Sequence, residues 1–143
     1  MEKNITFKFT EKNFANPNQM QALTLAYIGD SIYDIMSREY VMKNHLGKIN
    51  DLHKTVSTIV SARAQASFME NILSNSILTE QEEKIYNRAK NQKNNSKAKN
   101  ASIMEYKLAT GLEAVFGYLY LEKNFERLEE MFNYIIRLYE EKQ

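Results

Sequence analysis

Apolar residues recur at three- and four-residue intervals through most of the chain, the spacing of one face of an α-helix. The first such stretch begins at Asn16-Pro17 and continues to Gly47, where a glycine is expected to end the helix. A second stretch predicts one continuous helix over residues 50–73. Its apolar face is expected to comprise Leu52, Val56, Ile59, Val60, Ala64 and Phe68.

Capping residues mark three further helices. The segments "TEQE" (79–82) and "SIME" (102–105) each place a hydroxyl residue three positions before a glutamate, which predicts a capping box. The first of these helices is expected to end near Lys90 and the second near Leu121, and Asn124 is expected to cap the last helix. The pattern predicts an all-α protein.

Two segments lack the helical pattern. Residues 1–15 alternate apolar and polar positions in part and are interpreted as an extended N-terminal arm. Residues 91–101 are polar and rich in lysine and asparagine, which is typical of a loop. No repeat or long linker divides the chain, so residues 1–143 are expected to form a single domain.

Composition supports this interpretation and narrows the function. A chain of 143 residues with 43% apolar and 26% charged residues suits one globular domain, and its one proline and four glycines leave room for long helices. The absence of cysteine excludes disulfides, thiolate metal sites and a cysteine nucleophile, and it is consistent with a reducing cytoplasm. We find no signal peptide pattern and no apolar run of the roughly 20 residues that span a bilayer.

Two isolated carboxylates stand out within apolar runs. Asp30 is the only charge in "LAYIGDSIY" (25–33), and Glu113 is the only charge in "LATGLEAVFGYLYL" (108–121). Neither has a basic residue within four positions, so neither helix offers an intrahelical ion pair. Because an unpaired buried carboxylate is costly, each must reach solvent, meet a distant cation or bind a metal. Together they are hard oxygen ligands of the kind that Mg²⁺ or Mn²⁺ prefers.

Each acid also has a simpler interpretation. Asp30 is a candidate cap for a helix break after Gly29, and Glu113 is a candidate outward-pointing surface residue. Asp34 lies one turn after Asp30 and is either an auxiliary acid beside the site or a solvated surface charge.

Small residues recur near Glu113. Gly111, Ala114 and Gly117 stand three positions apart, which allows another backbone to approach this helix closely. Such an approach would bring acids on two helices together, although helices also cross in this way without any catalytic purpose.

A basic segment runs from Lys84 to Met104 and contains no acid, although the whole chain carries a net charge of only +1. Its six cations are Lys84, Arg88, Lys90, Lys93, Lys97 and Lys99. Lysines interleaved with asparagine, glutamine and serine suit contacts with the phosphates and sugars of a nucleic acid, while the lack of aromatics in the loop disfavours base stacking. An RNA duplex, which is read mainly through its backbone, fits best. The alternative is a solvated loop that binds nothing.

The two acid motifs resemble those of a known family. "YIGDSIYDIM" (27–36) resembles the signature motif of the ribonuclease III catalytic domain, and "GLEAVFGYLYLE" (111–122) resembles its second acidic motif. With "LHKTVSTIVSARAQA" (52–66), the likeness is closest to the mini class, which lacks a separate double-stranded-RNA-binding domain. It extends from about Gln21 to the C-terminus.

The resemblance implies an all-helical, homodimeric, cytoplasmic endoribonuclease that cuts double-stranded RNA with Mg²⁺, for which Mn²⁺ would substitute. It implies 5′-phosphate and 3′-hydroxyl products. It also implies a precursor of the large-subunit (23S) ribosomal RNA as substrate, with a ribosomal protein as a candidate helper. Asp30 and Glu113 match the metal-binding catalytic acids. Two further acids of the full-length enzymes are replaced by Ala26 and Thr110, as in the mini class, so one subunit supplies fewer ligands.

Candidate RNA-binding residues follow from the same resemblance and from the basic segment. They are Arg63, Arg88, Lys90, Asn91, Lys93 and Lys97. Neither His45 nor His53 is required as an acid or a base, because a metal-bound water needs no protein nucleophile. Two alternatives remain open: a non-catalytic adaptor that binds double-stranded RNA, suggested by the two missing carboxylates, and a helical scaffold for protein partners.

Overall fold

The computed structural model describes residues 16–44, 47–92 and 102–143, and this part of the chain is helical with no β-strand. The predicted all-α class is confirmed. A 3₁₀ turn, η1, is followed by six α-helices in the described residues. Their bounds are η1 Pro17–Gln19, α2 Ala22–Asn44, α3 Ile49–Val60, α4 Ala62–Ser74, α5 Glu80–Lys90, α6 Ile103–Leu121 and α7 Phe125–Glu141. The expected arm at residues 1–15 and nearly all of the expected basic loop lie outside the described residues.

The predicted capping residues begin three helices as expected. Thr79 and Glu82 form a complete capping box at the start of α5, and Ser102 and Glu105 form another at the start of α6. The side chain of Asn124 accepts a hydrogen bond from the backbone N–H of Arg127 and caps α7. Local sequence therefore determines where these helices begin.

The prediction of one continuous helix over residues 50–73 is wrong, because the backbone breaks at Ser61. This residue adopts an extended conformation, with φ −64° and ψ 155°, between α3 and α4. Its hydroxyl accepts a hydrogen bond from the backbone N–H of Ala64 at 3.1 Å, so Ser61 is the N-cap of a new helix. The two helices keep their apolar faces toward the core, which is why the hydrophobic pattern does not reveal the break.

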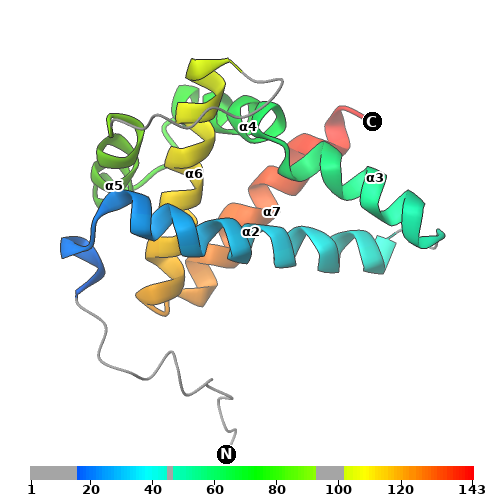
Figure 1. Ribbon diagram of the computed structural model, residues 1–143, viewed down its shortest axis with the longest axis horizontal. Coiled ribbons are helices and arrows are strands. Elements are labelled where there is room, and N and C mark those ends of the chain that lie inside the picture. Colours follow the sequence, from blue (N-terminus) through cyan, green and yellow to red (C-terminus); the bar gives the residue numbers. More distant parts are fainter. Residues whose placement is uncertain (1–15, 45–46, 93–101) are drawn as a thin grey trace, which may run out of the picture.

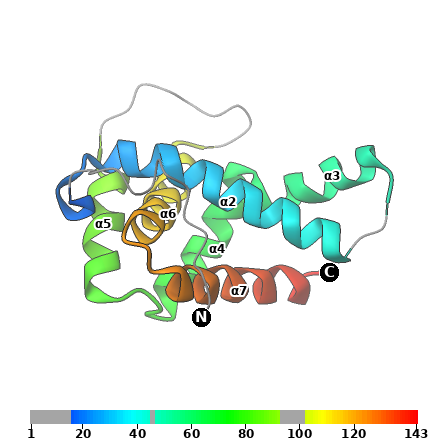
Figure 2. The same ribbon diagram turned by 90° about the horizontal axis from the view of Figure 1, so that it is seen from below.

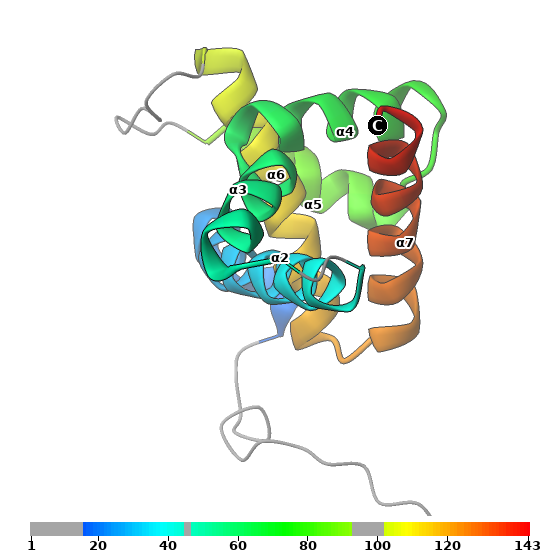
Figure 3. The same ribbon diagram turned by 90° about the vertical axis from the view of Figure 1, so that its right-hand side faces the viewer.

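The sixth helix, α6, occupies the centre of the molecule (Figure 1). Figure 2 looks nearly along its axis, with α2 on one side and α7 on the other, and in Figure 3 α4 runs across the top while α7 stands along one side. Between Leu108 and Leu119 every residue of α6 except Glu113 is buried. Glu113, the one carboxylate of this stretch, is therefore also its one partly exposed residue.

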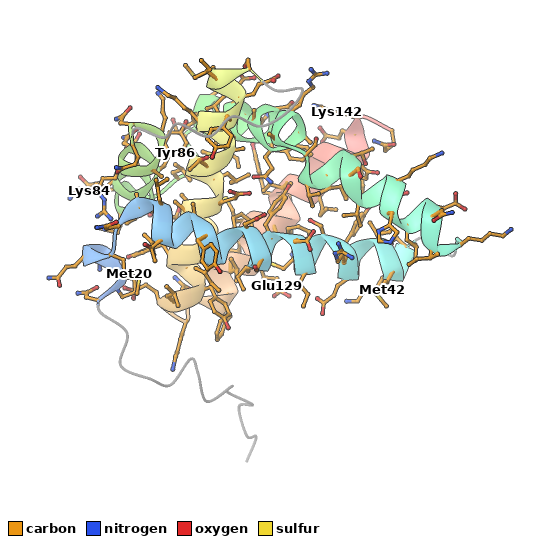
Figure 4. The ribbon with its side chains drawn as sticks, viewed as in Figure 1. Met20, Met42, Lys84, Tyr86, Glu129 and Lys142 are labelled. Carbon is orange, nitrogen blue, oxygen red and sulfur yellow. The ribbon has the colours of Figure 1, made fainter. Side chains whose placement is uncertain are left out.

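The most extensive helix packing joins α2 to α6, and two glycines make it possible. A Cβ atom on Gly29 would lie 1.7 Å from the carbonyl oxygen of Glu113, and one on Gly117 would lie 2.0 Å from the carbonyl oxygen of Leu25. The predicted close backbone approach is thus confirmed at Gly117. Gly111 packs against a side chain instead. Its missing Cβ makes room for the ring of Tyr86, which lies between α5 and α6 (Figure 4).

A buried ion pair ties α5 to α7. Arg127 donates from Nε to one carboxylate oxygen of Glu82 at 2.8 Å and from Nη2 to the other at 2.9 Å, and Nη2 also donates to the carbonyl of Ile77 at 2.8 Å. Glu82 is only 2% exposed, so its charge is neutralised inside the protein. None of the helices in the described residues is long and apolar enough to cross a membrane.

Candidate active site

The crossing of α2 and α6 brings Asp30 and Glu113 together. Asp30 is exposed on α2, and Glu113 is partly buried on α6. Their carboxyl groups lie close enough to share a hydrogen bond. Because Gly29 touches the backbone of Glu113 and immediately precedes Asp30, the close contact between the helices sets the separation of the two acids. The helix is continuous through Gly29, so the alternative interpretation of Asp30 as the cap of a helix break is wrong.

When no cation is present, the surroundings of Asp30 and Glu113 favour a proton bound to Glu113. The pKa of Glu113 is raised to about 8, mainly by burial and also by repulsion from the Asp30 carboxylate and by the hydrogen bond between the two acids, while a hydrogen bond from Gln65 acts in the opposite direction. Burial, with a smaller contribution from the Glu113 charge, also raises the pKa of the neighbouring Tyr33. A divalent cation between the carboxylates would remove the repulsion that keeps this proton bound.

Gln65 of α4 completes the surroundings of Glu113, and sequence reasoning missed it. Its Nε2 donates to Oε2 of Glu113 at 3.3 Å and to the carbonyl oxygen of Val60 at 2.9 Å, and the residue is 3% exposed. The only sequence signal is an uncharged polar side chain in the alanine-rich segment "SARAQA" (61–66). A helix pattern alone does not show which neighbour such a side chain meets.

The donor set fits a hard divalent cation with few protein ligands. No group of three or more histidine, cysteine, aspartate or glutamate residues that could hold a metal occurs in the described part of the chain. Ala26 is buried, and the hydroxyl of Thr110 donates to the carbonyl of Tyr106 at 2.9 Å, so neither position offers a third carboxylate. Two carboxylates are enough for Mg²⁺, which commonly keeps several waters and binds substrate phosphate oxygens.

Asp34, the predicted auxiliary acid, has a cation of its own. Its carboxylate accepts a hydrogen bond from Nε of Arg38 at 2.8 Å, one helical turn further along α2. The arrangement is that of a partly exposed i,i+4 ion pair. A role for Asp34 beside the metal site stays a prediction.

The predicted RNA-binding residues lie in different environments. Nε of Arg63 lies 3.7 Å from Oε2 of Glu105, with the arginine side chain 73% exposed. The guanidinium of Arg88 donates to the carbonyls of Asn18 and Met20, so it fastens the η1 segment to α5.

Two further predicted RNA-binding residues lie at the end of α5. Lys90 is half-buried, and Asn91 is exposed at the end of α5. His53 is exposed on α3. Lys93, Lys97 and His45 lie outside the described residues, and RNA contacts stay a prediction for the whole set.

Comparison with known proteins identifies the family. The model of the ribonuclease III domain matches residues 23–124, a range that contains both Asp30 and Glu113. The chain is 46% identical over 135 residues to a mini-ribonuclease 3 of Clostridium tetani, covering 94% of this chain and 86% of that protein. It is 45% identical over 119 residues to a mini-ribonuclease 3 of Enterococcus faecalis, covering 83% of this chain and 90% of that protein.

A solved structure shares the fold of this chain. A crystal structure of a protein from Fusobacterium nucleatum superposes with a TM-score of 0.75 at 34% sequence identity, covering 83% of this chain and 95% of that one. The family model and the solved structure thus each match most of this chain. The chain belongs to the ribonuclease III family, within its mini-ribonuclease III class, and is an endoribonuclease.

Proposed function

We propose that this endoribonuclease hydrolyses phosphodiester bonds of double-stranded RNA with a divalent cation, Mg²⁺ or in its place Mn²⁺, bound by Asp30 and Glu113. The observation that carries the proposal is the meeting of these two carboxyl groups at the α2–α6 crossing. Neither acid has a basic residue within four positions, and the pKa of Glu113 is raised to about 8. Neither helix therefore supplies an intrahelical countercharge to the pair, and a bound cation would favour ionisation of both acids.

Asp30 and Glu113 have different parts in binding the cation. Asp30 is exposed and accessible to a solvated ion, while Glu113 is held from the protein interior by Gln65. When bound, the cation would activate a water and neutralise charge on the attacked phosphate, so that no protein nucleophile is needed. Because Ala26 and Thr110 supply no carboxylate, water and substrate phosphate oxygens would have to fill the remaining ligand positions of the cation. The products are a 5′-phosphate and a 3′-hydroxyl.

The substrate and the assembly are proposed from the family resemblance. The enzyme acts in the cytoplasm as a homodimer and matures the large-subunit (23S) ribosomal RNA precursor, with a ribosomal protein as a candidate helper. Tyr27 and Ile35 are 81% and 55% exposed on α2, and these apolar side chains suit contact with a second subunit. Arg63 and Lys90 are candidate phosphate ligands.

The deciding experiment measures cleavage of a long RNA duplex by purified protein, with and without Mg²⁺. We expect cutting to require the ion and to fall by at least about 100-fold in Asp30→Asn and in Glu113→Gln, with binding of the duplex retained. Glu129→Gln is the matched control, because Glu129 is an exposed acid of α7 (Figure 4). Undiminished cutting by Asp30→Asn or Glu113→Gln would refute the proposed site.

A further inference from the structure

We propose that Gln65 is a positioning residue for the metal site, because its side-chain amide fixes the orientation of the Glu113 carboxylate and thereby sets the affinity for the divalent cation. The inference rests on the proposed function, since it takes Glu113 as a metal ligand. It goes beyond that function in assigning a role to a residue that carries no charge.

The break between α3 and α4 places Gln65 at the site. Val60 is the last residue of α3, and the extended conformation of Ser61 takes the chain out of the helix directly after it. A helix leaves its last carbonyl groups without helical partners. Nε2 of Gln65 donates to the Val60 carbonyl at 2.9 Å, so the helix end anchors the amide. From this anchor the same nitrogen reaches Oε2 of Glu113 at 3.3 Å.

The direction of the amide is determined by its partners. Both neighbours of Nε2, the Val60 carbonyl and the Glu113 carboxylate, are acceptors, so the two N–H bonds of the amide match two acceptors. The opposite orientation would place Oε1 against the same two oxygens, which repel it. In the observed orientation Oε1 is buried and has no hydrogen-bond partner. The two donor contacts are therefore kept at the cost of an unsatisfied acceptor.

A neutral donor suits a metal ligand better than a cation would. Lysine or arginine at this position would orient Glu113 but would also neutralise it and compete with the metal. The amide of Gln65 holds one carboxylate oxygen and leaves the full negative charge available to the cation. Hydrogen-bonding partners that orient metal ligands typically change metal affinity or activity by about 10- to 100-fold when they are removed.

The test replaces the amide with an apolar side chain of similar size, in Gln65→Met and, as a second variant, Gln65→Leu. Binding of Mn²⁺ is measured without RNA from the electron paramagnetic resonance signal of the free ion. We expect the Mn²⁺ affinity to fall by about 10-fold or more. We also expect the Mg²⁺ concentration that half-saturates cleavage to rise, with much of the rate recovered at high Mg²⁺.

A merely structural role predicts a different result. Ile72→Val, seven residues after Gln65 in the same helix, removes a buried methyl group and serves as a matched control for lost stability. Thermal melts of all variants show how much stability each has lost. We expect the Ile72→Val protein to bind Mn²⁺ as the parent does, even when its melting temperature falls as far as that of the Gln65 variants.

The outcomes separate this inference from the proposed function. If either folded Gln65 variant binds Mn²⁺ within about twofold of the parent while Asp30→Asn does not bind, the inference is wrong and the proposed function stands. If the Gln65 variants lose no more affinity than Ile72→Val at equal stability, the inference is also wrong. If Asp30→Asn and Glu113→Gln both bind Mn²⁺ like the parent, the proposed function itself fails.

Discussion

The backbone of Gly29 rests directly on the backbone of Glu113, so that a Cβ atom added to Gly29 would lie 1.7 Å from the Glu113 carbonyl oxygen and 2.7 Å from the backbone nitrogen of Gly117. Both neighbours are main-chain atoms, and no side chain can rotate to make room. This contact joins the helix that carries Asp30 to the helix that carries Glu113. The separation of the two acids is therefore built into the packing of the core.

Gly29→Ala is predicted to damage both stability and activity. The added methyl group must push α2 away from α6, and overpacking of this kind costs about 2 kcal/mol or more of the free energy of unfolding. Because the shift also separates Asp30 from Glu113, cleavage per folded molecule should fall with it. Denaturant melts and duplex cleavage under conditions where the variant is folded measure the two effects separately.

Gly47→Ala is the matched control for that substitution. A Cβ atom on Gly47 would lie 3.0 Å from Cβ of Asp51, and a backbone shift of a few tenths of an ångström relieves this contact because both residues are exposed and Gly47 lies outside the helices. This variant should keep its activity and nearly all of its stability. A Gly29→Ala protein that cuts RNA like the parent would show that the helix contact does not control the site.

The raised pKa of Glu113 predicts a pH-dependent stability in the absence of metal. The folded protein holds this proton up to about pH 8, whereas an ordinary glutamate titrates near 4.5. The folded state therefore binds more protons within that window, and the contribution of Glu113 to stability falls as the pH rises from about 5 to 8. We expect the melting temperature of the parent to fall over this range relative to that of Glu113→Gln.

The same melting experiment is repeated with divalent ions added. A bound cation stabilises the ionised carboxylates, so Mg²⁺ or Mn²⁺ should raise the melting temperature of the parent most at pH 8. Removal of the metal with a chelator should reverse the gain. Glu113→Gln should show neither effect. Parallel melting curves for the two proteins between pH 5 and pH 8 would mean that Glu113 does not hold the extra proton.

Whether a feature could be predicted from the sequence depends largely on how far apart in the chain the interacting residues lie. The capping boxes at Thr79 and Ser102 depend on residues three positions apart, so the sequence reveals them directly. The two acids were recognisable because a charge in an apolar run needs an explanation. The role of Gln65 was not, because a helix pattern does not show which distant group a polar side chain meets. The break at Ser61 was not either, because α3 and α4 both keep apolar faces toward the core and the hydrophobic pattern continues through it.

The pair between Glu82 and Arg127 illustrates the same limit, because it joins residues 45 positions apart. Arg127→Met is predicted to cost about 3 kcal/mol or more of stability, since it leaves the buried carboxylate of Glu82 without its partner. Cleavage by the fraction that remains folded should be unchanged, because the pair lies between α5 and α7. Denaturant melts together with cleavage rates corrected for the folded fraction test this.

The ion pair of Asp34 with Arg38 is the comparison. Both side chains are substantially exposed, so Arg38→Met should cost at most about 1 kcal/mol. Equal losses in Arg38→Met and Arg127→Met would show that burial does not determine the value of these pairs. An Arg127→Met protein as stable as the parent would contradict the structural role assigned to the buried pair.

Arg88 has two candidate roles that a conservative substitution separates. Its guanidinium donates to the carbonyls of Asn18 and Met20 and so fastens η1 to α5, and it is also a predicted RNA contact. Lysine keeps the charge but cannot reproduce both planar contacts. We therefore expect Arg88→Lys and Arg88→Met alike to speed amide hydrogen exchange in residues 19–25, measured by mass spectrometry of the intact folded protein.

If Arg88 also contacts phosphate, only Arg88→Met should lower the salt dependence of duplex binding, by about one ion. Unchanged exchange in both variants would contradict the anchoring role, because the two carbonyl contacts would then contribute nothing to holding this segment.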